Sequence, residues 1–194
     1  MPTDLSILLK RSGSEHSHLC PRQVLGVRMG LAGLAVLGLK APVTTKTALV
    51  IIETGGCFAD GIRAATGATV GHRTLKVEDL GKIAATITNL KTGSSLRLSP
   101  KLDIRTHALA YAPEEKRRYF AQLQGYQVMP DDELFNFQWV ELQTPASQII
   151  SHQNARAKCS NCGEEIINER EVMLDGKLLC QTCAYGGYYR LKQG

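Results

Sequence analysis

The sequence lacks a long hydrophobic run. Hydrophobic residues make up 43% of its 194 residues, yet the longest uncharged apolar stretch, Met29 to Leu39, contains 11 residues. A helix that crosses a membrane needs about 20 such residues. We therefore expect no membrane partner, and we expect this stretch to form a buried helix.

The sequence also lacks a concentration of basic charge. Its 23 lysines and arginines exceed its 18 aspartates and glutamates by five, and the longest basic run, Lys116 to Arg118, follows two glutamates. Such a mixed run is typical of a solvated helix face. A nucleic-acid-binding surface gathers its basic residues on one face, so we expect no nucleic-acid partner.

A secretory signal is missing as well, because the segment that begins the chain turns polar after Leu9. We therefore expect a cytoplasmic location. In such reducing surroundings the six cysteines of the chain should bind metal or react, because structural disulfides are rare there.

Four of the cysteines form the most specific motif in the chain. Cys159 and Cys162 make one C-x2-C pair, Cys180 and Cys183 make a second, and 17 residues separate the two pairs. Two such turns can complete a tetrahedral zinc site. The Asp175-Gly176 turn between them predicts a hairpin.

Such a four-cysteine site leaves no coordination position open for a substrate, so its expected role is structural. DNA binding is the usual alternative for a zinc ribbon. The segment 152–194 carries six basic and five acidic residues, and this near-neutrality argues against phosphate contacts. We therefore interpret it as a stabilising or protein-contact appendage.

Hydrophobic patterning predicts a mixture of helices and strands over the rest of the chain. We expect helices over 4–10, 21–39 and 57–66, with two more between 104 and 125. We expect strands over 46–53, 74–77 and 134–142, and a hairpin of 83–90 with 95–99. A polar linker over 144–158 would then separate an α+β core domain, 1–150, from a small zinc-ribbon or treble-clef-like domain, 151–194.

A second metal site is suggested by the other two cysteines. Cys20 precedes the proline that opens one predicted helix, and Cys57 opens another, where the helix dipole favours a thiolate. His16 and His18 lie close to Cys20, and nitrogen and sulfur ligands together suit zinc or another late first-row metal. If the two segments meet, three or four ligands converge; otherwise the histidines are solvated and the cysteines belong to the core. Asp60, one turn after Cys57, could be a ligand, a partner of a histidine, or a cap.

These residues and others resemble the FmdE family, which is named after formylmethanofuran dehydrogenase, over about residues 12–142. The shared motifs are His16-x-His18-x-Cys20-Pro21, Gly26, Arg28, Glu53, Cys57-x-x-Asp60-Gly-Ile, Thr66-Gly67-x-Thr69, Gly71 and Asp79-x-Gly81-Lys82-x-Ala-x-Thr86. The chain departs from the family at three positions. Arg22 and Ala68 stand where the family often has Gly and Cys, and His72 stands where Lys is common.

The resemblance implies an α+β core, a homodimer, and a cleft that binds metal. It implies that His16, His18 and Cys57 are the core ligands, with Cys20 as a further residue, and that Asp60 and Lys82 are polar groups of the cleft. It also implies association with a molybdenum- or tungsten-pterin formylmethanofuran dehydrogenase.

Three functions follow from the sequence. The first is a metal-binding accessory subunit or metal-handling partner of such an oxidoreductase, with one structural zinc and a second metal, expected to be zinc, in the core. The second is a stand-alone metalloenzyme that uses the core site. The third is a zinc-ribbon interaction or regulatory protein without catalysis.

Overall fold

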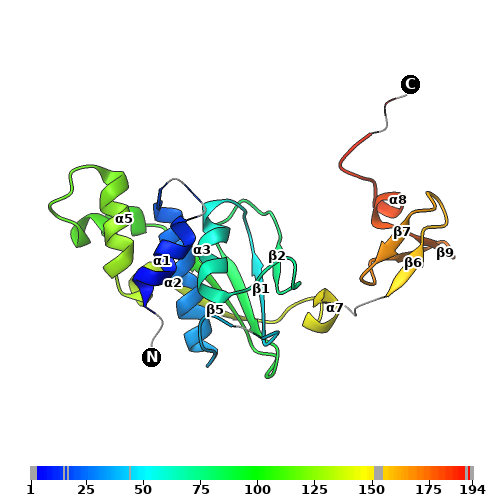
Figure 1. Cartoon of the computed structure of the whole chain (residues 1–194), viewed down its shortest axis with the longest axis horizontal. Coiled ribbons are helices and arrows are strands. Elements are labelled where there is room, and N and C mark those ends of the chain that lie inside the picture. The colour runs from blue at the N-terminus through cyan, green and yellow to red at the C-terminus, as the bar shows by residue number, and fades with distance from the viewer. Residues whose placement is uncertain are drawn as a thin grey trace. The chain divides into compact units, whose positions relative to one another are not determined.

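The computed structural model describes residues 4–14, 16, 18–43, 45–150, 155–190 and 192. The chain divides into two compact units, Met1–Ala146 and Ser147–Gly194. Figure 1 shows the elements of both units. The first unit mixes helices with one sheet, as expected for an α+β core.

A five-stranded sheet forms the centre of the first unit, in the order β2-β1-β3-β4-β5. Its strands are β1 (Ala48–Ile52), β2 (Leu75–Val77), β3 (Ala85–Asn89), β4 (Ser95–Pro100) and β5 (Phe135–Val140). β1 pairs with β2 in parallel, whereas the other neighbours are antiparallel. Leu49, Val50 and Ile52 have no exposed surface, which explains why β1 is a continuous apolar run rather than an alternating one.

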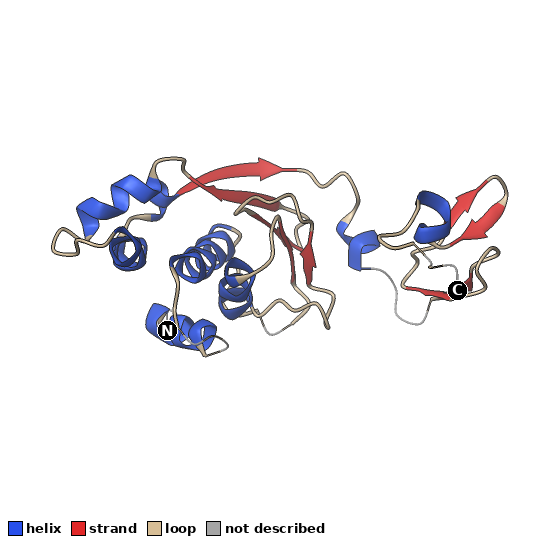
Figure 2. Cartoon of the chain, turned by 90° about the horizontal axis from the view of Figure 1, so that it is seen from above, coloured by secondary structure: helices blue, strands red, loops and turns tan. Residues whose placement is uncertain are grey.

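Three helices pack together on one side of this sheet (Figure 2). They are α1 (Leu5–Gly13), α2 (Pro21–Val36) and α3 (Cys57–Thr66). A β-carbon added to Gly33 of α2 would lie 2.6 Å from Ile87 and 3.0 Å from Leu98. The absence of a side chain at Gly33 therefore lets α2 lie directly on β3 and β4.

The helix layer leaves most of the edge strand β5 uncovered. Trp139 and Phe137 are opposite the buried residues Leu96 and Leu98 in the β4–β5 register. Paired residues share a face of the sheet, yet the exposed fractions of Trp139 and Phe137 are 65% and 38%. The apolar face of the sheet thus continues beyond its helical cover.

Several expected elements differ from those observed. The segment between β4 and β5 forms α4 (Ile104–His107), the 3-10 helix η1 (Ala108–Tyr111), α5 (Arg118–Val128) and α6 (Asp131–Leu134). The sequence patterns end the second helix at Gly125, but α5 continues past it. A β-carbon at Gly125 would lie 2.5 Å from the Ala108 carbonyl oxygen, so this glycine permits a helix contact instead of ending the helix.

The second unit is built from short elements. They are α7 (Ala146–Ile150), β6 (Arg156–Lys158), β7 (Glu165–Ile167), β8 (Val172–Leu174), β9 (Lys177–Leu179) and α8 (Gln181–Tyr185). β6 pairs with β7 and β8 with β9, both antiparallel. The expected Asp175-Gly176 hairpin is present. The short helix α7 lies within the segment expected to be a polar linker.

No described helix is long and apolar enough to span a membrane.

Candidate metal centres

The close packing of α2 on α3 positions the two core cysteines. A β-carbon at Gly26 would lie 2.3 Å from the Phe58 carbonyl oxygen, and one at Gly61 would lie 2.3 Å from the Gln23 carbonyl oxygen. Farther along, a β-carbon at Gly30 would meet Ala65 at 2.8 Å. Contacts that advance together along both helices mean that the helices run parallel, with their N-termini at the same end.

Cys20 and Cys57 therefore lie at neighbouring helix N-termini. Cys20 is the N-cap of α2 and is buried, whereas Cys57 is the first residue of α3 and is partly buried. Burial is the main cause that raises the pKa of Cys57, and a hydrogen bond with the Cys20 thiol raises it further. This direction is opposite to the one that the helix-dipole argument predicts, because burial and the neighbouring thiol outweigh the backbone N–H groups.

His16 connects the loop before α2 to α3. Its Nε2 lies 2.8 Å from Asp60 Oδ2. The exposed fractions of the two side chains are 35% for His16 and 27% for Asp60. Of the roles considered for Asp60, the structure therefore favours the partner of a histidine. A carboxylate bonded to one ring nitrogen fixes the ring orientation and leaves the other nitrogen available to a metal. His18 lies in the same loop and is exposed.

Gln23 holds this loop in place, and the sequence patterns do not identify it as a site residue. Its side chain is fully buried; Oε1 accepts from the Cys20 N–H at 2.8 Å, and Nε2 donates to the Ser12 carbonyl at 2.9 Å. The signal available in the sequence is a glutamine three residues after an N-cap, the spacing of a capping box. Gln23 ties the end of α1 to the start of α2.

Glu53, Arg97 and Lys82 form a charged cluster at the end of β1. Arg97 donates to both carboxylate oxygens of Glu53, from Nε at 2.6 Å and from a terminal nitrogen at 2.8 Å. The Arg97 hydrogen bond lowers the pKa of Glu53 against the effect of burial, and the Lys82 charge lowers it further. Lys82 thus lies beside Glu53, and its backbone N–H donates to the Glu53 carbonyl at 3.1 Å. The sequence motifs include Glu53 and Lys82 but give no signal for Arg97. Arg97 comes close to Glu53 only through the pairing of β3 with β4.

Tyr119 of α5 is a further residue near the thiols that the sequence does not indicate. Burial raises the pKa of Tyr119, and the charges of Cys20 and Cys57 raise it further. Its side chain remains 44% exposed. The phenol is thus within electrostatic reach of both cysteines and remains partly exposed.

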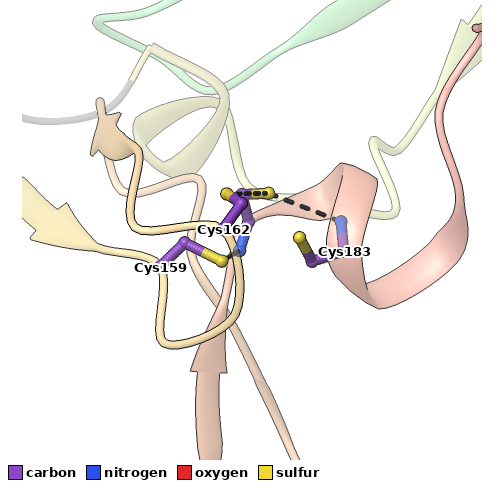
Figure 3. Close-up of side chains that lie close together, drawn as sticks. Cys159, Cys162 and Cys183 are labelled. Carbon is purple, nitrogen blue, oxygen red and sulfur yellow. Dashed lines mark hydrogen bonds between the residues drawn. The ribbon is translucent and has the colours of Figure 1, made fainter. Parts of the chain in front are cut away.

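The four C-terminal cysteines come together in the second unit. Each offers a sulfur, and all four sulfurs lie within 4.8 Å of one another. Figure 3 shows the sulfurs of Cys159, Cys162 and Cys183 directed toward one another. Sγ of Cys162 is 3.9 Å from Sγ of Cys180. Zinc–sulfur bonds of about 2.3 Å give a tetrahedral sulfur–sulfur separation of about 3.8 Å, so the cluster fits a zinc ion.

The backbone around this cluster favours thiolates. The Cys180 N–H donates to Cys159 Sγ at 3.3 Å, and the Cys183 N–H donates to Cys180 Sγ at 3.4 Å. Backbone hydrogen bonds from Cys162 and Cys180 lower the pKa of Cys159 to about 6. Although the backbone hydrogen bond of Glu164 lowers the pKa of Cys162, burial and the neighbouring thiols raise it to about 12. Four adjacent thiols cannot all ionise without a cation between them, and a divalent metal would supply that charge.

Among the described residues, only the four C-terminal cysteines bring three or more metal-ligand atoms within 4.8 Å of one another, so the structure does not gather His16, His18 and Cys57 in this way. His16, His18 and Cys57 remain a predicted site, with Cys20 and Asp60 beside it.

Known proteins similar to this chain indicate its family. Residues 15–136 match the family described as "FmdE, Molybdenum formylmethanofuran dehydrogenase operon". A "Probable S-adenosyl-L-methionine-binding protein" of Archaeoglobus fulgidus is 31% identical over an alignment covering 95% of this chain. The chain spans about half of that relative, 54% of its length.

A solved structure shares the fold. The crystal structure of a tungsten formylmethanofuran dehydrogenase FmdE-like protein from Syntrophus aciditrophicus has a TM-score of 0.60. The two chains are 19% identical, and the alignment covers 96% of this chain and 95% of that one. At this identity the similarity establishes the fold alone. The family match over most of the first unit shows that the chain belongs to the FmdE family.

Proposed function

We propose that the first unit binds a metal ion, zinc by its ligand chemistry, through His16, His18 and Cys57. The observation that supports this most directly is the 2.8 Å contact between His16 and Asp60. It joins the loop before α2 to the helix that carries Cys57, two segments about forty residues apart in sequence. Two histidines and a thiolate form a nitrogen and sulfur set that suits zinc.

The neighbouring residues have distinct roles in this proposal. Asp60 orients His16 and increases the basicity of its free nitrogen. Cys20 is close enough to Cys57 to serve as a fourth ligand or as its hydrogen-bond partner. With three protein ligands, a bound metal would keep a position for water or substrate and would act there as a Lewis acid.

Metal content tests the site. Protein purified without chelator should contain two metal ions per chain by elemental analysis. Cys57→Ala should lose one ion and keep its fold by circular dichroism. His107→Ala is the matched control, since His107 also pairs with an aspartate, Asp103, at 3.3 Å but on an exposed surface; it should keep both ions. A single ion in wild-type protein fully loaded with zinc, or unchanged metal in Cys57→Ala, would exclude the core site.

We further propose that the protein is an accessory subunit or metal-handling partner of a molybdenum- or tungsten-pterin dehydrogenase, and that it forms a homodimer in the cytoplasm. The description of the family supports the association with such an enzyme. Co-purification of the tagged protein with pterin-containing subunits, and a dimer mass by light scattering, are the expected results. If the protein instead turns over a substrate alone, with a rate lost in Cys57→Ala, the metalloenzyme alternative is correct.

Binding of S-adenosylmethionine is a second candidate, supported by the description of the Archaeoglobus relative. Isothermal titration of the metal-loaded protein with S-adenosylmethionine tests it. Saturable binding would assign this ligand to the part of the relative that the chain matches. Absence of binding would leave the ligand to the remaining half of that protein.

A further inference from the structure

A small cavity lies between α1 and α3, beside the candidate core site. We call it the α1–α3 cavity, and its lining consists of Arg11, Ser12, Asp60, Arg63, Ala64, Gly67 and Thr69. Asp60, Arg63, Ala64 and Gly67 follow one another at helical spacing, so one side of α3 faces it. Arg11 and Ser12 come from the last turn of α1.

The size of the cavity limits what it can hold. Its volume is about 70 Å³, and one water requires about 10–15 Å³ by this measure, so there is room for roughly five water-sized atoms. A tetrahedral oxyanion such as phosphate has about that many heavy atoms. A nucleoside or other drug-sized ligand needs a pocket of about 300 Å³ or more, so the cavity cannot take a whole ligand of that kind.

The charges around the cavity favour an anion. Two arginines, Arg11 and Arg63, line the cavity together with one aspartate, Asp60, whose Oδ2 is already bonded to His16. Arg11 makes no salt bridge with any residue in the described ranges. Arginine binds tetrahedral oxyanions well because its planar fork presents parallel N–H groups to two oxygens.

Hydroxyl groups add hydrogen-bond donors. Ser12 is 2% exposed, and its Oγ has no hydrogen-bond partner among the described residues. A buried helical serine usually bonds a carbonyl one turn back, and an unpaired buried hydroxyl is costly. Thr69 accepts from the His72 N–H at 3.2 Å through Oγ1, so its own proton can be donated. Ser12 and Thr69 both line the cavity.

We propose that the α1–α3 cavity binds a tetrahedral oxyanion, either free or as the phosphate group of a small molecule, through Arg11, Arg63 and Ser12. The site is separate from the proposed metal and uses different ligands. Asp60 is common to both sites, since it lines the cavity and bonds His16. A bound anion would therefore lie beside the loop that carries the two histidines.

Isothermal titration of the full-length, metal-loaded protein with inorganic phosphate, and separately with glycerol 3-phosphate, tests the proposal. Saturable binding is expected. Arg11→Gln should weaken it about ten- to hundredfold, the effect of losing one hydrogen bond to a charged group. Lys10→Gln removes a charge from an exposed position on the same helix and is the matched control; it should bind like the wild type.

Ser12→Ala provides an independent measurement. Because the hydroxyl is unpaired without ligand, Ser12→Ala should keep or raise the Tm of the free protein and weaken phosphate binding. If the wild type binds inorganic phosphate and Arg11→Gln binds it more weakly, the ligand is a free oxyanion. If the wild type binds only glycerol 3-phosphate, and Arg11→Gln binds it more weakly, the ligand is an organic phosphate. If neither probe binds, or if Arg11→Gln and Arg63→Gln bind like the wild type, the proposal is wrong.

The proposals for the metal site and for the anion site can be tested separately. Cys57→Ala should lose the core metal and retain phosphate binding, whereas Arg11→Gln should retain the metal. If Cys57→Ala abolished phosphate binding and Arg11→Gln did not, the anion would be a ligand of the metal, which would overturn the cavity assignment.

Discussion

Individual side chains determine the geometry at the end of β1. Glu53 is 8% exposed, and the bidentate contact with Arg97 joins β1 to β4 across the intervening strand β3. A buried charge is tolerated only when it is paired and hydrogen-bonded. This ion pair therefore fixes the strand end from which Gly55, Gly56 and Cys57 continue into α3.

The Glu53–Arg97 pair should make stability depend on pH. The pKa of Glu53 is lowered from its ordinary value of 4.5, so its stabilisation is complete above that value and is lost as pH falls below it through the folded-state pKa. Glu53→Gln should lower the free energy of unfolding at neutral pH by about 2–3 kcal/mol. As the pH falls below about 5, the wild type should therefore lose more stability than this variant.

Urea denaturation at several pH values measures this difference. Glu165→Gln is the control, because Glu165 pairs with Arg156 on an exposed surface, where such a pair contributes about 0–1 kcal/mol. If the stability of wild type and Glu53→Gln fell in parallel on acidification, Glu53 would not be the titrating group.

At the scale of elements, glycine decides how the helices meet. Gly26, Gly30 and Gly33 lower the intrinsic helix propensity of α2, which predicts a close backbone neighbour without indicating whether it belongs to the same chain or to a second one. The structure places α3 of the same chain there, with Gly26 against Gly61. The parallel contact is what brings Cys20 to Cys57.

Gly26→Ala should disturb both stability and the core site. The added methyl group would lie 2.3 Å from the Phe58 carbonyl oxygen, so α2 and α3 must move apart. The expected loss in free energy of unfolding is about 1–3 kcal/mol, the usual cost of overpacking, together with weaker core metal binding. Gly71→Ala is the control, since a β-carbon there meets nothing within 4 Å. Equal stability of the two variants in urea would contradict the close packing.

Sequence patterns predicted most elements but few of the contacts between them. β1, α3 and the β3–β4 hairpin lie where the hydrophobic periodicity and the turn residues of the sequence predict them. The predicted end of α5 was wrong. A glycine such as Gly125 looks the same in the sequence whether it ends a helix or permits a close contact with another helix. Gln23, Arg97 and Tyr119 could not be assigned to the site, since each acts through a tertiary neighbour. The C-x2-C pairs were the exception, because their local spacing already specifies the cluster.

At the scale of the whole molecule, the two units differ in what stabilises them. The first has an extensive buried core, whereas the buried cluster of the second consists of Cys159, Ile166 and Leu179 with partly buried neighbours. So small a core cannot offset the entropy of folding without additional cross-links. A metal held by four thiolates would supply that stabilisation.

Removal of metal should therefore unfold the second unit and spare the first. In Cys180→Ala, amide hydrogen exchange of residues 155–190 should become rapid, while β1 and β3 stay protected. Cys57→Ala should leave exchange in the second unit unchanged. Protection of β6 to β9 in metal-free Cys180→Ala would show that the unit folds without the ion.

The exposed position of Trp139 on β5 has a practical consequence for spectroscopy. It is the one tryptophan of the chain, and its ring is 65% exposed at the uncovered edge of the sheet. Its fluorescence in the native protein should resemble that of a solvated indole, and unfolding should shift the emission little. A blue shift would instead report that another surface has covered the edge strand, so the same fluorophore that is insensitive to denaturation would detect association.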